Sequence, residues 1–327
     1  MFSIIIPLYN KAPYVEKAIR SVLDQTCREF ELIVVDDGST DNSWKIVQNL
    51  FKKYQQDSSM TPPLGGLIGA FQPNSGVSIA RNNGVKHAKY DFIAFLDADD
   101  WWDKDFLKEM KSLIAKYPNA SIFGSKYFWV KNGKYKKSVN HESNNFKGYI
   151  DYFKAYTYAW WMPLTSISTV IKKSVLLEIN GFKPNIKFGE DFDLWIRIVS
   201  NYKIAYSNKA LAFYNQDVTS KDRALGTKLW NPENHYIFNL DYLHSEEERN
   251  PSLKKLIDGL RVRALLRYYL AGKYKKETQV ILNRVDFTKQ SKYYQRIYHW
   301  PKSLVRFYFL TLKIGSMVKQ QIIKLTN

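Results

Sequence analysis

Short apolar runs alternate with amphipathic stretches along the first hundred residues of the chain. Four of these runs have the length and composition of strands buried on both faces, at residues 3–8, 31–35, 67–71 and 91–96. The stretches between them repeat apolar residues at the spacing of one helical face, as in the stripe of Val15, Ala18, Ile19, Val22 and Leu23. This alternation predicts an α/β fold with a mostly parallel sheet flanked by helices on both faces.

After residue 117 the pattern is less regular. Further extended segments are predicted at residues 120–130, 166–172 and 204–214. Asn132-Gly133 is a hairpin-turn signal, a short helix over residues 175–180 is expected to end at Gly181, and another helix begins near Asp191. From about residue 234 onward the pattern is mainly helical.

Polar side chains follow three of the predicted strands at the point where each strand ends. They are Tyr9-Asn10, Asp36-Asp37 and Asp97-Ala98-Asp99. The carboxyl ends of parallel strands lie at one edge of a sheet, where α/β proteins bind their ligands, so we expect these clusters to converge. Asn10 can also cap the helix predicted to begin near Pro13, and Ser39 or Asp41 can cap the next one.

Asp97-Ala98-Asp99 supplies two carboxylates, two residues apart, directly after a buried strand. Mg²⁺ and Mn²⁺ prefer such oxygen ligands and complete their coordination with water and substrate phosphates. An Asp-x-Asp sequence is more often a solvated turn or a helix cap. Its position after a buried apolar strand nevertheless favours a site for Mn²⁺ or Mg²⁺.

Three further clusters can each bind a substrate or be ordinary structure. A carboxylate of Asp36-Asp37 can accept a hydrogen bond from uracil or ribose, or it can cap the following helix. Arg81 can donate two hydrogen bonds to a phosphate, or it can be an exposed arginine on a surface helix. Glu190-Asp191 opens a helix whose dipole favours the ionised carboxylate that a general base needs, or it is an ordinary acidic helix start.

Five sequence motifs combine these clusters in a recognisable order. They are Ser-Ile-Ile-Ile-Pro-Leu-Tyr-Asn, Val-Val-Asp-Asp-Gly-Ser-Thr-Asp, Asn-Ser-Gly-Val-Ser-Ile-Ala-Arg-Asn-Asn-Gly, Phe-Leu-Asp-Ala-Asp-Asp and Gly-Glu-Asp-Phe-Asp-Leu-Trp. Over roughly residues 1–215 the chain thereby resembles the family 2 glycosyltransferases, which have the Rossmann-like GT-A fold. The resemblance implies an inverting enzyme of bacterial surface-polysaccharide synthesis. It would move a hexosyl or N-acetylhexosaminyl group from a nucleotide sugar, with UDP expected as the nucleotide, to an acceptor hydroxyl.

The same resemblance implies roles for individual residues. Pro7 and Tyr9 match positions beside the base, Asp37 matches the uracil contact, and Arg81 matches an arginine near the nucleotide. Asp97-Ala98 matches the contact to the donor sugar and ribose, Asp99 the metal ligand, and Asp191 the catalytic base. Further candidates for the same site are Asn10, Asp36, Glu190 and Trp101.

The chain departs from the family pattern at one position. Many members carry a His shortly after the last strand of the domain, whereas residues 213–217 here read Phe-Tyr-Asn-Gln-Asp. Asp217 can supply an oxygen ligand instead, or the third metal contact is missing. Four tryptophans can stack on a sugar or pack in the core, namely Trp101, Trp102, Trp160 and Trp161.

These matches predict a catalytic domain at residues 1–220 and a basic helical region at residues 221–327. Within the first, residues 1–100 bind the nucleotide sugar and residues 101–220 form the acceptor side. The net charge is +18, and residues 241–327 contribute 18 Lys and Arg against 7 Asp and Glu. An anionic lipid, a phosphate-bearing acceptor or nucleic acid can explain this excess, as can a solvated helical surface.

Residues 300–325 mix apolar and aromatic side chains with Arg and Lys. This suits an amphipathic helix on an anionic membrane, which would fit a lipid-linked acceptor, or a helix that packs back on the catalytic domain. The N-terminus lacks the basic and apolar regions of a signal peptide, and no apolar run is long enough to span a bilayer. We therefore expect a cytoplasmic protein, peripheral on the inner face of the membrane if that helix binds lipid.

Two other function classes compete with the glycosyltransferase. A sugar nucleotidyltransferase also uses an α/β nucleotide-binding fold, but it usually carries a Gly-rich N-terminal loop with a basic residue, which this sequence lacks. A nucleic-acid-binding protein would account for the positive charge. No recognised nucleic-acid module occurs in the sequence, so nucleic acid is not an expected partner.

Overall fold

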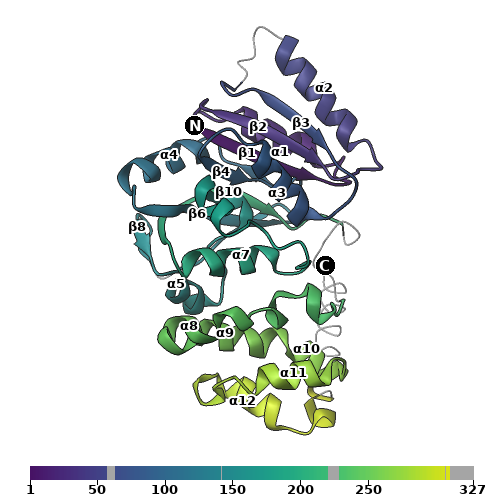
Figure 1. The fold of residues 1–327 in the computed structure, drawn as a ribbon, viewed down its shortest axis with the longest axis vertical. Helices are drawn as coiled ribbons and strands as arrows, with labels where there is room; N and C mark the ends of the chain where they lie inside the picture. Colours follow the sequence, from purple (N-terminus) through teal and green to yellow (C-terminus); the bar gives the residue numbers. More distant parts are fainter. Residues whose placement is uncertain (57–62, 141, 220–227, 306, 310–327) are drawn as a thin grey trace, which may run out of the picture. The chain divides into compact units, whose positions relative to one another are not determined.

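A computed structural model describes residues 1–56, 63–140, 142–219, 228–305 and 307–309 (Figure 1). The chain divides into two compact units, the first made of Met1–Lys228 and Asn234–Tyr236 and the second of Leu229–Glu233 and Ile237–Asn327. The boundary that we predicted at residue 220 falls in residues 220–227, outside the described residues. The predicted division of the first domain at residue 100 stays a prediction.

A mixed sheet forms the centre of the first unit. The strands of the described residues are β1 (Phe2–Leu8), β2 (Phe30–Asp36), β3 (Leu67–Phe71), β4 (Phe92–Phe95), β5 (Trp101–Trp102), β6 (Ala120–Lys131), β7 (Lys134–Lys137), β8 (Lys147–Ile150), β9 (Thr169–Lys172) and β10 (Lys203–Asn215). Their order is β3-β2-β1-β4-β9-β6-β10-β5, with β7 paired to β6 and β8 to β10. The first four strands are parallel, as predicted, whereas β9 runs antiparallel to both β4 and β6.

The strands β1 and β2 have the burial that their sequences predict. Every residue of β1 and β2 is buried, which suits their continuous apolar runs. The carbonyl of Ile5 accepts a hydrogen bond from the amide of Leu96. Pro7 lies two residues on, beyond the last pair that β1 makes with β4, so its missing N–H removes no bond from that ladder.

Seven α-helices of the described residues belong to the first unit. They are α1 (Val15–Leu23), α2 (Ser43–Gln56), α3 (Val77–His87), α4 (Phe106–Lys116), α5 (Tyr152–Ala159), α6 (Lys173–Glu178) and α7 (Glu190–Val199), with a 3₁₀ turn η1 (Ser166–Ser168) before β9. The apolar stripe predicted for the first helix is buried in α1. One large core joins the buried faces of α1, α2 and α4 to the sheet.

Several sequence predictions about local structure were wrong or incomplete. Asn10 does not cap the first helix, because α1 begins at Val15; its side-chain oxygen instead accepts the amides of Thr40 and Asp41 at 2.8 and 3.3 Å. Only the second half of residues 166–172 is a strand, since its first three residues form η1. The elements α4, α5, β5 and β8 were not predicted.

The second unit is helical, as predicted from residue 234 onward. It contains short 3₁₀ turns at η2 (Pro232–Asn234), η3 (Tyr236–Phe238), η4 (Asp241–Leu243) and η5 (Phe287–Lys289), and the helices α8 (His244–Arg249), α9 (Pro251–Ala264), α10 (Leu266–Ala271), α11 (Lys275–Leu282) and α12 (Lys292–His299). The turns η2 and η3 cross between the two units. In the part of the chain that the structure describes, every helix is too short or too polar to cross a bilayer. Most of the helix predicted over residues 300–325 lies outside the described residues.

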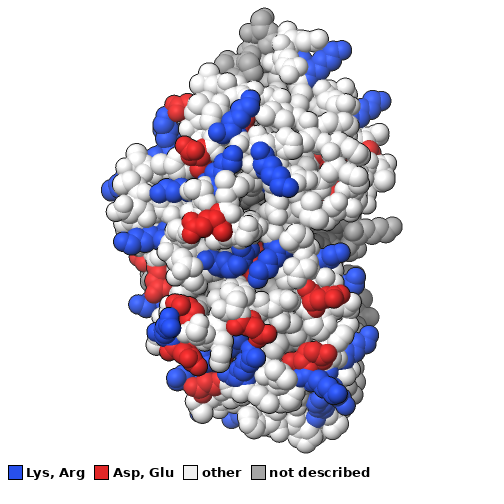
Figure 2. Space-filling view, viewed as in Figure 1, with Lys and Arg blue, Asp and Glu red and all other residues white. Residues whose placement is uncertain are grey.

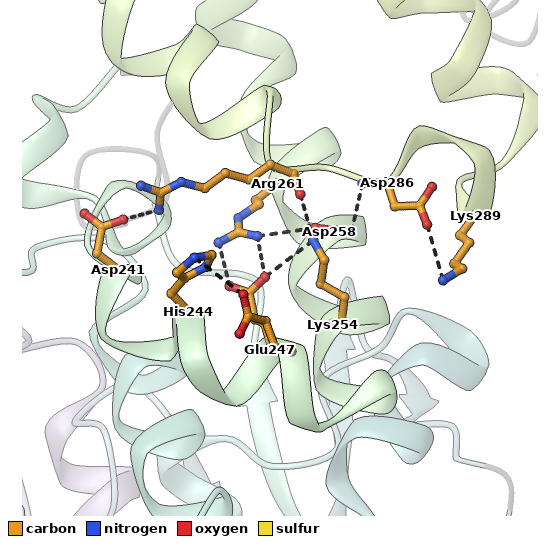
Figure 3. A network of polar contacts seen from close by, with 10 residues as sticks. Asp241, His244, Glu247, Lys254, Asp258, Arg261, Asp286 and Lys289 are labelled. Atoms are coloured by element: carbon orange, nitrogen blue, oxygen red, sulfur yellow. Dashed lines mark hydrogen bonds and ion pairs between the residues drawn. The ribbon is translucent and has the colours of Figure 1, made fainter.

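A buried ion-pair network links the helices of the second unit (Figure 3). The guanidinium of Arg261 donates to both carboxylate oxygens of Glu247 at 2.6 Å and to Asp258 at 3.3 Å. The ammonium of Lys254 contacts the same oxygen of Asp258 at 2.6 Å, while the other oxygen accepts the amide of Asp286 at 3.1 Å. The network therefore joins α8 and α9 to the segment that follows α11.

Candidate active site

Three neighbouring strands, β2, β1 and β4, end at the same edge of the sheet. Tyr9 follows β1 and is 45% exposed, whereas Pro7 is buried within that strand. Asp36 ends β2 and Asp37 follows it, and both are buried. Asp97, Ala98 and Asp99 come just after β4, with Ala98 buried between two partly exposed carboxylates.

Asp37 holds the turn that leads into α3. One of its carboxylate oxygens accepts the side-chain amide of Gln72 at 2.7 Å and the backbone amide of Ser75 at 2.8 Å, and the other accepts the amide of Gly76 at 2.8 Å. Gly76 adopts a φ of 93°, which a residue with a side chain rarely adopts. A carboxylate has about four acceptor positions, and these contacts occupy three of those of Asp37. Asp36 accepts the amide of Ser39, as expected of a strand-to-helix turn.

Arg81 connects three segments that are far apart in the sequence. Its guanidinium, on α3, is buried and donates to Asp97 at 2.7 Å, to Glu190 at 3.2 Å and to the hydroxyl of Ser166 at 3.5 Å. Our alternative interpretation of Arg81 as an exposed surface arginine is therefore wrong. Arg81 joins the carboxylates after β4 to those at the start of α7. The phosphate contact stays a prediction, and both terminal nitrogens of Arg81 already have carboxylate partners.

The charges in this cluster shift each other's pKa values. Burial lowers the pKa of Arg81, but the carboxylates of Asp97 and Glu190 raise it by more, to above its ordinary value. Burial, with the neighbouring charge of Asp191, raises the pKa of Glu190 to about 7. Burial also raises the pKa of Asp191, which Arg81 and the amide of Phe192 oppose. A carboxylate with a raised pKa is a stronger base than one in water.

Three residues that we did not predict complete the cluster. The ammonium of Lys11 lies 2.8 Å from an oxygen of Asp99, and the hydroxyl of Ser166 lies 3.3 Å from Asp97. Asp100 is buried and accepts the amide of Asn215 at 2.7 Å, which ties the end of β10 to the segment after β4. Lys11 directly follows Tyr9-Asn10, so its place at the strand end could have pointed to it. The sequence carries no such signal for Ser166.

Asp97 and Asp99 are the residues that fit a divalent cation. Their side chains are 25% and 20% exposed, so solvent reaches both. Burial and then the nearby charge of Asp97 raise the pKa of Asp99, although Lys11 opposes this. Two carboxylates leave coordination positions for water and phosphate oxygens, as Mg²⁺ requires. Among the described residues, no group of three or more His, Cys, Asp or Glu side chains is arranged to hold a metal ion.

Other candidate residues have structural contacts. Both carboxylate oxygens of Asp217 accept the amide of Asn132, at 2.8 and 2.9 Å, so Asp217 fastens the hairpin turn between β6 and β7. Trp102 is buried and donates to the carbonyl of Ile167 at 2.6 Å, and packing is therefore its role. The ring of Trp101 stacks on that of Phe213, with centroids 5.4 Å apart, and is covered by the ammonium of Lys17.

Comparison with known sequences identifies relatives over about two thirds of the chain. The family profile described as Glycosyl transferase family 2 matches residues 3–176. An uncharacterized glycosyltransferase of Rickettsia conorii is 34% identical over 212 residues, which are 64% of this chain and 32% of that protein. The chain thus spans about a third of the length of that relative. A Bacillus subtilis glycosyltransferase, TuaG, named for teichuronic acid biosynthesis, is 27% identical over 70% of this chain and 86% of its own length.

Comparison with solved structures finds the same fold. The structure of S. aureus TarS (residues 1–349) in complex with UDP-GlcNAc superposes with a TM-score of 0.61, covering 86% of this chain and 90% of that one at 20% identity. At this identity the likeness shows the fold alone. It confirms the predicted GT-A architecture, with a helical C-terminal part.

Proposed function

Given that the chain belongs to glycosyl transferase family 2, we propose that it transfers a sugar from a UDP sugar to a hydroxyl group of a saccharide acceptor. The observation that carries this proposal is the contact of Arg81 with both Asp97 and Glu190. It joins a strand-end carboxylate pair suited to a nucleotide sugar to a helix-start pair suited to a general base. We propose a uridine nucleotide by analogy with TarS, which shares the fold and was solved with UDP-GlcNAc.

Asp191 is the proposed general base. It lies in the first turn of α7, where the helix dipole stabilises its ionised form. Its carboxylate takes the proton of the acceptor hydroxyl while that oxygen bonds to the anomeric carbon of the donor. The bond from this carbon to the diphosphate breaks on the opposite side, so the configuration inverts. General base catalysis of this kind contributes about 10²–10⁴-fold to a rate.

The strand ends would bind the donor. Tyr9 offers an exposed ring to the base, and Asp37 offers its remaining acceptor position to the uracil imide. When bound, Mn²⁺ or Mg²⁺ held by Asp99, with Asp97 beside it, would neutralise charge on the diphosphate leaving group. Lys11 already pairs with Asp99 and can turn its ammonium to a phosphate. Glu190 would position Arg81 and keep the charge of the cluster balanced.

The acceptor and the membrane contact belong to this proposal as well. The name of TuaG supports an acceptor in cell-surface polysaccharide synthesis. Trp300, Leu304, Phe307 and Tyr308 are exposed at the start of the 300–325 segment, which supports contact with an anionic membrane that carries a lipid-linked acceptor. Nucleic-acid binding stays the less favoured alternative, and on the face that Figure 2 presents Lys and Arg are interspersed with Asp and Glu.

Release of nucleoside diphosphate from a panel of UDP, GDP and dTDP sugars tests the proposal. We expect slow hydrolysis of a UDP sugar with Mn²⁺ or Mg²⁺, lost with EDTA and in Asp99→Ala. Asp24→Ala, which removes a carboxylate just after α1, is the matched control. Release of pyrophosphate from UTP and a sugar phosphate would instead indicate a nucleotidyltransferase, and would contradict the proposal.

A further inference from the structure

A row of side chains crosses three strands next to the candidate active site. Tyr214 on β10 is directly opposite Trp129 on β6, and Trp129 is directly opposite Lys136 on β7. Residues directly opposite in a sheet point to the same face. The rings of Trp129 and Tyr214 have centroids 5.6 Å apart, which confirms that they share a face.

Trp161 adds a second indole to this row. Its ring centroid lies 5.1 Å from that of Trp129, and its N–H donates to the hydroxyl of Tyr127 at 2.9 Å. The ammonium of Lys136 lies 4.7 Å from the Trp161 ring. Trp160 follows the last residue of α5 and has a left-handed backbone conformation, with a φ of 51°. This turn of the backbone sets the position of Trp161. The result is an aromatic row with a cation at one end.

The other end of the row reaches the acidic cluster. Tyr214 immediately precedes Asn215, whose amide is held by Asp100. Burial raises the pKa of Tyr214, and the charges of Asp100, Asp97, Asp191 and Asp99 add to this, so its hydroxyl lies within the field of the whole cluster. The aromatic row therefore extends the candidate active site toward the β6–β7 hairpin. Trp129, at 37% exposure, is its most accessible ring.

The hairpin itself is strongly basic. Residues 131–137 contain Lys131, Lys134, Lys136 and Lys137 and no acidic residue. All four lysines are exposed. Aromatic rings stack on the apolar faces of sugars, and exposed ammonium groups attract carboxylates and phosphates. A row that joins these features is complementary to a sugar chain that carries negative charge.

We propose that Trp129, Trp161, Tyr214 and Lys136 form an acceptor subsite for an anionic saccharide, whose sugar rings lie on the aromatic row and whose carboxylate or phosphate meets Lys136. This inference rests on the proposed glycosyltransferase function and adds the chemical class of its acceptor. Tyr214 is the member of the row next to the acidic cluster, so an acceptor lying on the row would reach Asp191 from the hairpin side.

The opposite face of the same strands provides matched controls. There Phe213 stacks between Trp101 and Phe128 with centroids 5.4 Å from each, and Tyr135 closes over both Phe128 and Phe213. Lys137 is directly opposite Phe128 on this face. Lys137→Gln removes the same charge from the same strand as Lys136→Gln, but away from the proposed subsite.

Binding of paired oligosaccharides to the full-length protein tests the inference. The probes are hyaluronan hexasaccharide against neutral chitohexaose, and N-acetylglucosamine 6-phosphate against N-acetylglucosamine, titrated calorimetrically at low salt with UDP present. We expect at least one anionic probe to bind about tenfold more tightly than its neutral partner, with the preferred probe showing whether carboxylate or phosphate is recognised. Lys136→Gln should abolish the preference, whereas Lys137→Gln should change it less than about twofold.

Removal of the ring tests the aromatic part of the subsite. Trp129→Ala should weaken both members of the preferred pair by about tenfold, and Trp129→Phe, which keeps a ring, should recover most of this loss. Equal binding of anionic and neutral probes, equal effects of the two lysine variants, or unchanged binding by Trp129→Ala would each overturn the inference. Hydrolysis of a UDP sugar by the wild-type protein without acceptor reports on the proposed function separately, so the two failures are distinguishable.

Discussion

Two buried arginines, one in each unit, contact carboxylates in similar ways but in different surroundings. Arg81 and Arg261 are each 3% exposed, and each has a buried Nε without a hydrogen-bond partner among the described residues. The carboxylates around Arg261, from Glu247 and Asp258, are 4% and 3% exposed. Those around Arg81, from Asp97 and Glu190, are 25% and 17% exposed.

The difference separates a structural network from a proposed binding site. In the second unit the two carboxylates are buried, and their contacts hold α8, α9 and the segment after α11 together. In the first unit the carboxylates of Asp97 and Glu190 remain accessible to solvent beside a fixed positive charge. A buried ion pair is by itself weak evidence for either role. Access to the carboxylate oxygens is what distinguishes a site that can bind a ligand.

The largest effect, on the rate of sugar transfer, is expected in the solvent-accessible carboxylate cluster around Arg81, which we call the open cluster. Asp191→Asn keeps the size of the side chain but removes the proposed base, so sugar transfer should fall by about 10²–10⁴-fold with the fold retained. Rates of UDP release and circular dichroism measure the two quantities. Asp193→Asn, two residues along α7, removes a buried carboxylate that pairs with Lys183 and Arg197. It should lower stability while the rate per folded molecule changes less than about threefold. If the wild type and Asp191→Asn transferred sugar at equal rates, the cluster around Arg81 would no longer differ in function from the network around Arg261.

Substitutions in the buried ion-pair network around Arg261 should lower the stability of the protein. Arg261→Met leaves Glu247 and Asp258 as buried charges with fewer partners, and the free energy of unfolding should fall by about 3–5 kcal/mol. Lys289→Met removes an exposed ion pair with Asp286 and should lower the free energy of unfolding far less. Denaturant titration of both variants measures this. If both variants lost a similar free energy of unfolding, burial of the network would contribute less to stability than we infer.

A gain in stability that depends on pH is expected at Glu190. The pKa of Glu190 rises from an ordinary 4.5 to about 7 in the folded protein, so the folded state binds more protons than the unfolded state between these values. The ionised side chain therefore costs stability as the pH rises through this window, and the cost is constant above it. Glu190→Gln mimics the protonated form and should raise the free energy of unfolding more at about pH 8 than at about pH 4. The same gain at both pH values, measured by denaturant titration, would argue against this electrostatic account.

The fold of the first hundred residues could be predicted from the sequence because its signals are local. β1, β2 and β4 are apolar runs that stop at polar clusters, and parallel strands bring such ends together. β5 is a pair of residues whose strand conformation depends on pairing with β10. α5 carries aromatic residues on several faces, so it has no clear amphipathic stripe. Elements of this kind are defined by tertiary contacts, which a single sequence does not show.

The sequence predicts which carboxylates belong to the candidate site, but it does not predict the contacts that link them to other side chains. Asp97, Asp99 and Asp191 stand at element ends, where sequence position is informative. The burial of Arg81 depends on the fold of residues about 100 positions away, at Glu190. Likewise, Trp129 lies in an aromatic strand, and only the register with Tyr214 and Lys136 shows that they form one row.

Calorimetric titration of UDP in the presence of Mn²⁺ tests most directly whether the open cluster around Arg81 is a nucleotide-sugar site. We predict that the wild type and Lys289→Met bind UDP with similar affinity and that Asp99→Asn binds it at least about tenfold more weakly. Failure of the wild type to bind UDP, or equal affinity in Asp99→Asn, would contradict the account.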